Sequence, residues 1–121
     1  MVQVTGIGGI FFRARDPVAL KDWYEKHLGV WFDAEGTGMW DQQSGPTVVS
    51  PFSEDTEYFP RDKAFMLNFR VDDLDAAMRE FESAGISVET QPDWDVPGIG
   101  RFARIYDPEG NPIELWQPEA G

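Results

Sequence analysis

The first part of the chain opens with an alternating apolar pattern that changes to a helical one. In residues 6–15, the apolar side chains at positions 10, 12 and 14 fall on one face, as in a half-buried strand. Asp16 and Pro17 follow with the residue types preferred at a helix N-cap and at the first helical position. Gly29 suits the end of that helix. The pattern therefore predicts a strand followed by a helix.

The second part of the chain repeats this order. Residues 65–71 alternate in the same way and predict a strand. Asp72 or Asp73 is the expected N-cap of a second helix, which we expect to end at Ala84-Gly85. Short segments between turn residues predict further strands at 30–34, 38–41, 47–50, 86–89, 102–106 and 113–117. Each half therefore follows the order β-α-β-β-β.

Two segments show neither the alternation of a strand nor the apolar spacing of a helix. Residues 53–62 are polar and acidic, and we interpret them as a linker between the halves. Residues 91–100 are rich in proline and glycine and predict a loop. Trp94 in this loop is either a lid over a cavity or, the interpretation we favour, a packing anchor for the loop.

Matching motifs indicate that the two halves arose by duplication. Phe12-Arg13-x-x-Asp16 matches Phe69-Arg70-x-x-Asp73, and the segment from Asp41 to Pro46 matches the segment from Asp107 to Pro112. The identities are few, so a chance match is the alternative.

Composition narrows the class of protein. With 121 residues, 41% of them apolar and 14% aromatic, the chain can form one compact domain, residues 1–121. The absence of cysteine excludes disulfide bonds, thiolate metal sites and a thiol nucleophile. A net charge of −12 argues against nucleic acid or a membrane surface as a partner. No apolar run reaches the roughly 18 residues that span a bilayer, and no secretory signal pattern is present, so we expect a cytoplasmic protein.

The last strand carries the most informative motif. Asp107-Pro108-Glu109-Gly110-Asn111 has the composition of a tight turn, in which Asp and Asn bond back to nearby backbone and glycine supplies a positive φ. The strand that follows places Glu114 between apolar residues. A carboxylate at such a position needs a specific reason, because burying it is costly.

Three motifs together resemble the vicinal oxygen chelate superfamily, which includes glyoxalase I, extradiol dioxygenases, fosfomycin-resistance enzymes and bleomycin-resistance proteins. They are Asp16-Pro17 followed by Trp23-Tyr24-x-x-x-Leu28-Gly29, then Val71-Asp72-Asp73-Leu74-Asp75, then Asp107-Pro108-Glu109-Gly110-Asn111-Pro112-Ile113-Glu114-Leu115. The resemblance implies an α+β fold of two tandem β-α-β-β-β modules, about 4–57 and about 63–118. Their sheets would form a curled mixed sheet around a shared cavity, and a homodimer is the implied assembly.

The resemblance also implies where a metal would bind. In metal-dependent relatives the ligands are His, Gln or Glu at four equivalent strand positions, which here are Gly9, Val48, Met66 and Glu114. One carboxylate cannot hold a divalent metal, because a catalytic site needs about three protein ligands. We therefore expect neither a metal nor another cofactor. The alternative is a divalent metal, held after a register shift near Val48 or by unconventional ligands such as Asp41 and Gln42.

Glu114 is the candidate for chemistry. It alternates with residues that should face the core, so it should point into the cavity, where it needs a partner. Arg13 and Arg70 lie on the cavity-facing side of their predicted strands, and Asn68 can donate a hydrogen bond. Glu114 is therefore either one end of an ion pair that ties the modules together, or a tentative acid/base group or polar anchor for a ligand.

The other cavity-facing positions are mainly apolar, which is typical of small-molecule sites. The predicted ligand-binding residues are Phe11, Arg13, Trp40, Val48, Met66, Asn68, Arg70 and Trp116. For Phe11 and Met66, simple filling of the core is an equal alternative.

The favoured function is therefore that of a small-molecule-binding protein without the usual metal site. It would bind or sequester an apolar or aromatic ligand, as bleomycin-resistance proteins do. One alternative is a metal-dependent lyase, isomerase or dioxygenase of the glyoxalase kind, and another is a metal-free isomerase that uses Glu114. A structural or regulatory dimer without a ligand is the third. The sequence leaves open whether the chain is an enzyme and what its ligand is.

Overall fold

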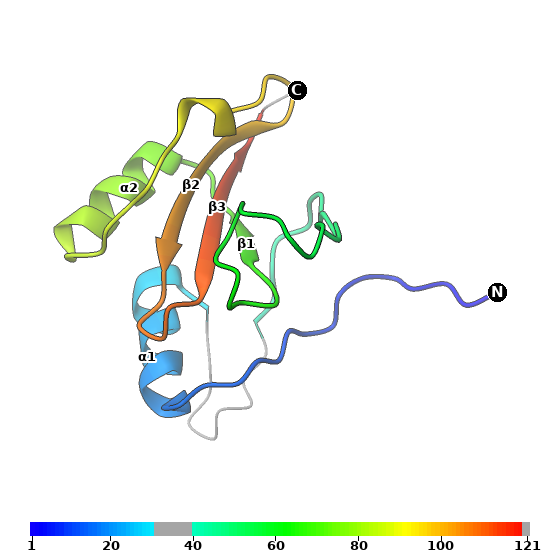
Figure 1. Cartoon of the computed structure of the whole chain (residues 1–121), viewed down its shortest axis with the longest axis horizontal. Coiled ribbons are helices and arrows are strands. Elements are labelled where there is room, and N and C mark those ends of the chain that lie inside the picture. Colours follow the sequence, from blue (N-terminus) through cyan, green and yellow to red (C-terminus); the bar gives the residue numbers. More distant parts are fainter. Residues whose placement is uncertain (31–39, 120–121) are drawn as a thin grey trace.

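The computed structural model describes residues 1–30 and 40–119. Its elements are α1 (Pro17–Leu28), β1 (Leu67–Arg70), α2 (Leu74–Ser83), the short 3-10 helix η1 (Pro92–Trp94), β2 (Gly100–Tyr106) and β3 (Pro112–Pro118). The three strands form one mixed sheet in the order β1-β3-β2. Figure 1 shows α1 and α2 on one side of this sheet, while the N-terminal residues run away from it as an extended arm.

The register of the sheet decides which side chains share a face. β3 pairs parallel with β1 and antiparallel with β2, which sets Asn68, Glu114 and Arg104 in one row across the three strands. Side chains alternate along a strand, so the adjacent row points to the other face. That adjacent row belongs to the core between sheet and helices, whose buried members are Leu20, Tyr24, Leu67, Leu74, Phe81, Ala103, Ile105, Ile113 and Leu115.

Both predicted helices are confirmed, with their caps. The Asp16 carboxylate accepts a hydrogen bond of 3.1 Å from the Ala19 N–H, and Gly29 ends α1 with a positive φ of 69°. Asp73 caps α2 in the same way, so Asp73 and not Asp72 is the N-cap. The capping side chains satisfy backbone N–H groups that the first helical turn leaves unpaired.

The strands of the second half are confirmed, at 67–70, 100–106 and 112–118. At 86–89 the structure has a single bridge, from Glu89 to Arg104. Residues 6–15 and 47–50 do not pair with the sheet, although their alternation predicted strands. Alternation identifies a segment that can form a strand, but a strand also needs an edge to pair with. The strands predicted at 30–34 and 38–41 lie largely in 31–39, outside the described residues.

The sheet formed by the described residues is therefore small and open, and it does not close around a cavity. The α+β class is confirmed, and the arrangement as two tandem modules stays a prediction. Part of the first half nevertheless packs as its pattern indicated. Phe12 and Ala14, which share a face, pack against the core, whereas Phe11 and Arg13 are exposed.

The turn before β3 has the predicted internal hydrogen bonds. Asp107 Oδ1 accepts from the N–H groups of Glu109 and Asn111, at 2.9 and 3.0 Å, and Gly110 has a φ of 82°. The other oxygen of Asp107 accepts a hydrogen bond of 2.7 Å from the Tyr24 hydroxyl of α1. The turn therefore also holds the first helix against the sheet of the second half.

Candidate ligand-binding site

Glu114 lies in the middle of the sheet face opposite the helices, and its carboxylate is paired with two neutral donors. Its Oε2 accepts a hydrogen bond of 2.5 Å from the Tyr58 hydroxyl, and its Oε1 accepts one of 2.8 Å from the Asn68 side-chain amide. The residue is only 7% exposed. Such pairing is what makes a buried carboxylate tolerable, because an unpaired one would pay its full desolvation cost.

Burial raises the pKa of the Tyr58 phenol well above its ordinary value, and the hydrogen bond to Glu114 raises it further. The phenol therefore stays protonated at neutral pH and remains the donor in its contact with the carboxylate.

Arg104 of β2 neighbours Glu114 in the same row. It is 2% exposed, and its guanidinium lies 5.1 Å from the ring centroid of Tyr58 and 5.1 Å from that of Trp94. Its Nη2 donates a hydrogen bond of 3.1 Å to the Tyr58 carbonyl oxygen. Two ring faces and a carbonyl thus hold a buried cation in place. Its Nε has no hydrogen-bond partner among the described residues.

The next row of this face consists of Arg70, Trp116 and Phe102, two of which are aromatic. Trp116 of β3 stacks on Phe102 of β2, with an angle of 5° between the rings and 6.1 Å between their centroids. The Trp116 indole donates a hydrogen bond of 3.0 Å to the Ile99 carbonyl, which fixes its orientation. We call these five residues, Asn68, Phe102, Arg104, Glu114 and Trp116, the Glu114 face. It combines flat apolar surface with one fixed anion and one fixed cation.

The structure brings some of the predicted ligand-binding residues to this face and leaves others apart from it. Asn68 and Trp116 lie on it, and Met66 immediately precedes β1. The Trp40 ring packs against Phe69, with 6.0 Å between the centroids. Phe11 and Val48 are 94% and 70% exposed, and both belong to segments that do not pair with the sheet.

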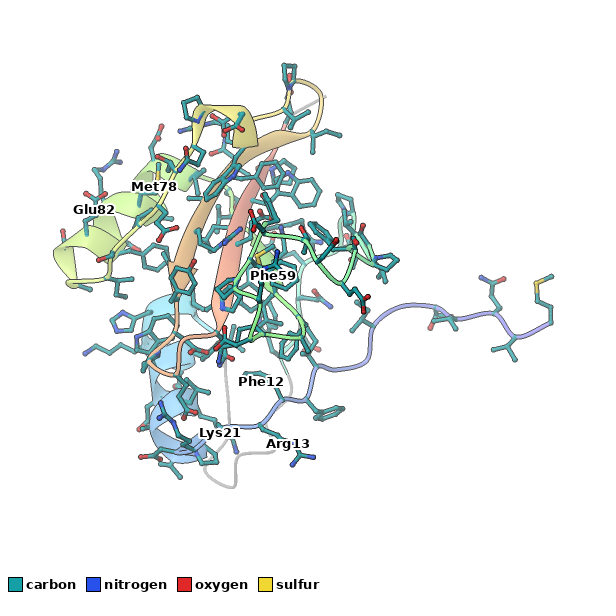
Figure 2. The ribbon with its side chains drawn as sticks, viewed as in Figure 1. Phe12, Arg13, Lys21, Phe59, Met78 and Glu82 are labelled. Atoms are coloured by element: carbon teal, nitrogen blue, oxygen red, sulfur yellow. The ribbon has the colours of Figure 1, made fainter. Side chains whose placement is uncertain are left out.

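The ion pair expected between Glu114 and an arginine is not formed in the described part of the chain. Arg70 donates instead to the backbone carbonyls of Gln43, at 2.8 Å, and of Pro46. Arg13 lies on the N-terminal segment, and Figure 2 shows it well away from Phe59, which is in the loop over the sheet. The guanidinium of Arg70, one of the two arginines expected near Glu114, therefore binds backbone carbonyls of residues 43–46 instead.

The four positions at which the family resemblance implies metal ligands do not form a ligand set here. Gly9 has no side chain, Val48 offers no donor atom, and both oxygens of Glu114 already accept hydrogen bonds. Within residues 1–30 and 40–119, no three His, Asp or Glu side chains gather closely enough to hold a metal ion. The donor set present at these positions does not suit a divalent metal.

Sequence reasoning missed Tyr58 and Arg104. The signal for Arg104 was available, because it alternates with two apolar residues in 102–106 just as Glu114 does in the last strand. No comparable signal exists for Tyr58, which lies in the segment interpreted as a linker. Trp94 packs against Arg104 and Tyr58, as the favoured interpretation of a packing anchor implied.

Two hollows on the surface lie away from Glu114. One, of about 690 Å³, is lined by residues of the loop 95–100, the end of β3 and the residues that follow β1. The other, of about 520 Å³, lies along α2 near Arg79. None of the helices described is both long and apolar enough to cross a membrane.

A sequence model of the Glyoxalase/Bleomycin resistance protein/Dioxygenase superfamily matches residues 6–115. The crystal structure of TnmS3, an antibiotic binding protein from Streptomyces sp. CB03234, is 27% identical with a TM-score of 0.62, and the match covers 98% of this chain and 100% of that one. A glyoxalase/bleomycin resistance protein from the same organism is 29% identical with a TM-score of 0.49, over 86% and 93% of the two chains. No curated protein sequence matches.

Proposed function

The chain belongs to the Glyoxalase/Bleomycin resistance protein/Dioxygenase superfamily, and on that premise we propose that it binds an apolar or aromatic small molecule on the Glu114 face without the help of a metal. The observation that carries this proposal is the pairing of a buried carboxylate with two neutral donors, Tyr58 and Asn68. Neutral donors can be exchanged for those of a ligand without leaving a second charge unpaired. If the partner of Glu114 were an arginine, a ligand that displaced it would leave a buried charge unpaired.

The composition of the face supports a flat ligand. Trp116 and Phe102 provide stacked rings, and Arg104 provides a cation whose position is fixed by its aromatic neighbours. An apolar surface with a few fixed polar groups is the usual construction of a small-molecule site. The similarity to an antibiotic binding protein along 98% of this chain supports the same class of function.

The absence of a metal is part of the proposal and rests on donor chemistry. A glycine, a valine and a thioether accompany one carboxylate at the family's ligand positions, and none of these three is a good ligand for zinc or magnesium. A buried carboxylate also suits a general acid or base, so a metal-free isomerase that uses Glu114 is the second candidate. A metal-dependent enzyme of the glyoxalase or dioxygenase kind is the outcome that metal analysis would reveal.

We also propose that the chain acts as a homodimer in the cytoplasm. Support for the dimer comes from the N-terminal arm and the segment around residue 48, which do not pair with the sheet and carry exposed apolar side chains. Their exposed apolar side chains are Val2, Val4, Ile7, Ile10, Phe11, Val48 and Val49. A second copy would cover this surface, and it could bring Phe11 and Val48 to a ligand site. The cytoplasm is proposed from the sequence features alone.

A ligand screen with a matched variant tests the proposal. A panel of flat aromatic compounds is expected to include some that raise the melting temperature and quench tryptophan fluorescence, through Trp116 or Trp40. Glu114→Gln keeps the shape of the side chain but removes its charge, so it should weaken binding of those compounds. For the isomerase alternative, the same variant should abolish turnover and leave binding intact.

Elemental analysis of protein purified without chelator tests whether the chain binds a metal. Less than stoichiometric metal together with ligand binding supports the proposal. Stoichiometric nickel, zinc, iron or manganese would favour a metal-dependent enzyme instead, and a panel that produced neither quenching nor stabilisation would contradict small-molecule binding.

A further inference from the structure

Tyr58 contacts the Glu114 face as a small aromatic ligand would. Its ring lies against the guanidinium of Arg104, 5.1 Å from ring centroid to Cζ, and edge-on to Trp94, with centroids 6.0 Å apart. Its hydroxyl donates to Glu114 at 2.5 Å. One phenol thus makes a ring contact with the fixed cation and a hydrogen bond with the fixed anion.

The segment that carries Tyr58 is a loop without helix or strand. Figure 1 shows it on the side of the sheet away from α1 and α2. Within the segment, the Tyr58 N–H bonds Thr56 Oγ1 at 3.2 Å and the ring packs on Phe52, while the ring also lies edge-on to Trp94. The bonds from Tyr58 to the strands are those to Glu114 and Arg104. Such a segment can move with less disruption than an element paired into the sheet.

Arg104 is better explained by a ligand than by the loop alone. The residue is buried, yet its Nε finds no acceptor among the described residues. An unsatisfied buried donor is uncommon and costly, and residues 1–30 and 40–119 offer this nitrogen no acceptor, which leaves it available to an acceptor on a ligand. The loop provides Tyr58 as a donor to Glu114, but it provides no acceptor to this nitrogen.

We propose that Tyr58 occupies the site as an internal stand-in, and that the ligand is a phenolic aromatic molecule that displaces it. The ligand's ring would lie on Arg104, its hydroxyl would donate to Glu114, and an oxygen acceptor on the same ring system would receive the Arg104 Nε–H. This inference rests on the proposed function, and it adds the chemical class of the ligand and a role for residues 53–62.

The displacement lowers the apparent affinity of the ligand in a predictable way. Only molecules whose loop has withdrawn can bind, so the observed dissociation constant is the intrinsic one divided by the fraction of open molecules. Removing the Tyr58 hydroxyl weakens the closed state without touching Glu114 or Arg104. The proposal therefore predicts a gain of affinity from a substitution at a residue in contact with the site.

Calorimetric titration with 2-naphthol, which carries the hydroxyl donor but no second oxygen, tests the displacement of Tyr58 and the contact with Glu114, and 2-methoxynaphthalene is the probe that lacks the donor. Tyr58→Phe should bind 2-naphthol roughly tenfold more tightly than the unmodified chain, the factor for one hydrogen bond to a charged group. Tyr106→Phe is the matched control and should leave the affinity unchanged. 2-Methoxynaphthalene should bind about tenfold more weakly than 2-naphthol, and Glu114→Gln should remove that preference.

The outcomes separate this inference from the proposed function. If the unmodified chain binds 2-naphthol but Tyr58→Phe binds it equally or less tightly, the stand-in role is wrong and small-molecule binding stands. Equal binding of the two probes would overturn the phenolic class. If neither the unmodified chain nor Tyr58→Phe binds any aromatic compound of the panel, both proposals fail. Tyr58→Ala should show a larger gain than Tyr58→Phe, and the Phe variant decides if the Ala variant does not fold.

Discussion

The Tyr58 hydroxyl lies 2.5 Å from Oε2 of Glu114, so a loop between the two halves of the chain closes over the acid of the last strand. The sequence separation is 56 residues, and the contact joins a segment without regular structure to the central strand of the sheet. The carboxylate is thereby kept buried in the absence of a cationic partner within hydrogen-bond distance in the described residues. Removing the Glu114 carboxylate should leave both donors, the Tyr58 hydroxyl and the Asn68 amide, without their acceptor.

Glu114→Ala should destabilise the fold by about 1–3 kcal/mol, because the Tyr58 hydroxyl and the Asn68 amide both lose their acceptor. Glu114→Gln retains an oxygen that can accept one of the two bonds, so it should cost less. Urea unfolding followed by tryptophan fluorescence measures both. Equal stability of the Ala variant and the unmodified chain would mean that these contacts contribute nothing to the fold.

Tyr24→Phe should destabilise the fold by about 1.5–3 kcal/mol, the range for a hydrogen bond to a charged group. Its hydroxyl donates at 2.7 Å to Asp107, which also orders the turn before β3, and burial raises the pKa of the Tyr24 phenol so that it stays protonated. Tyr106→Phe is the control, because the Tyr106 hydroxyl makes no hydrogen bond among the described residues. A melting temperature that fell equally in the two variants would contradict this role.

The contact of Glu109 with the start of α1 should weaken in acid. Its carboxylate accepts from the N–H groups of Arg15 and Asp16, at 2.6 and 2.9 Å, and these bonds lower its pKa from the ordinary 4.5. A lowered pKa in the folded chain means that the stabilisation is fully present above pH 4.5 and is lost as the pH falls through the folded-state value. Urea midpoints measured against pH should therefore converge for the unmodified chain and Glu109→Gln in acid. Parallel curves would rule the linkage out.

Asp73→Ala should cost about 1 kcal/mol, and Asp72→Ala should cost less than about half of that. The reason is that the Asp73 carboxylate accepts from the Ala76 N–H at 3.0 Å, whereas Asp72 is exposed and outside the helix. The two adjacent aspartates make a matched pair in which only the cap differs. Helical circular dichroism and urea unfolding measure the effect, and a larger loss in the Asp72 variant would reverse the assignment.

The second half of the chain was predictable because its signals are local. Asp73, Gly110 and the alternation around Glu114 each act within a few residues, so caps, turn and strands could be predicted from the sequence. The lack of sheet pairing by residues 6–15 was not predictable, because alternation says nothing about which edge a strand meets. Asn68 was predicted as a donor to Glu114, but the other partner, Tyr58, was missed for the same reason. Tyr58 reaches it through tertiary packing of a segment whose polar composition indicated only a linker.

Arg70 and Arg104 show how far the residues of the site could be predicted from the sequence. Both alternate toward the Glu114 side of the sheet, and composition alone gave no reason to prefer either. Contacts with residues distant in sequence decide which arginine lies beside Glu114. Backbone carbonyls of residues 43–46 bind Arg70, whereas two aromatic rings hold Arg104. The face that results was identified by Glu114 in the sequence, but its cation was not.

Proton–nitrogen NMR spectra of the labelled chain during titration with 2-naphthol test the central claim most directly. Binding on the Glu114 face should shift the Asn68 side-chain amide and the Trp116 indole N–H, which lie on that face. The indole N–H of Trp23, on α1 at the other side of the sheet, should stay in place. Saturable shifts of Asn68 and Trp116 with an unchanged Trp23 are the predicted result. Shifts confined to Trp23, or no shift at the highest soluble concentration of 2-naphthol, would contradict the account.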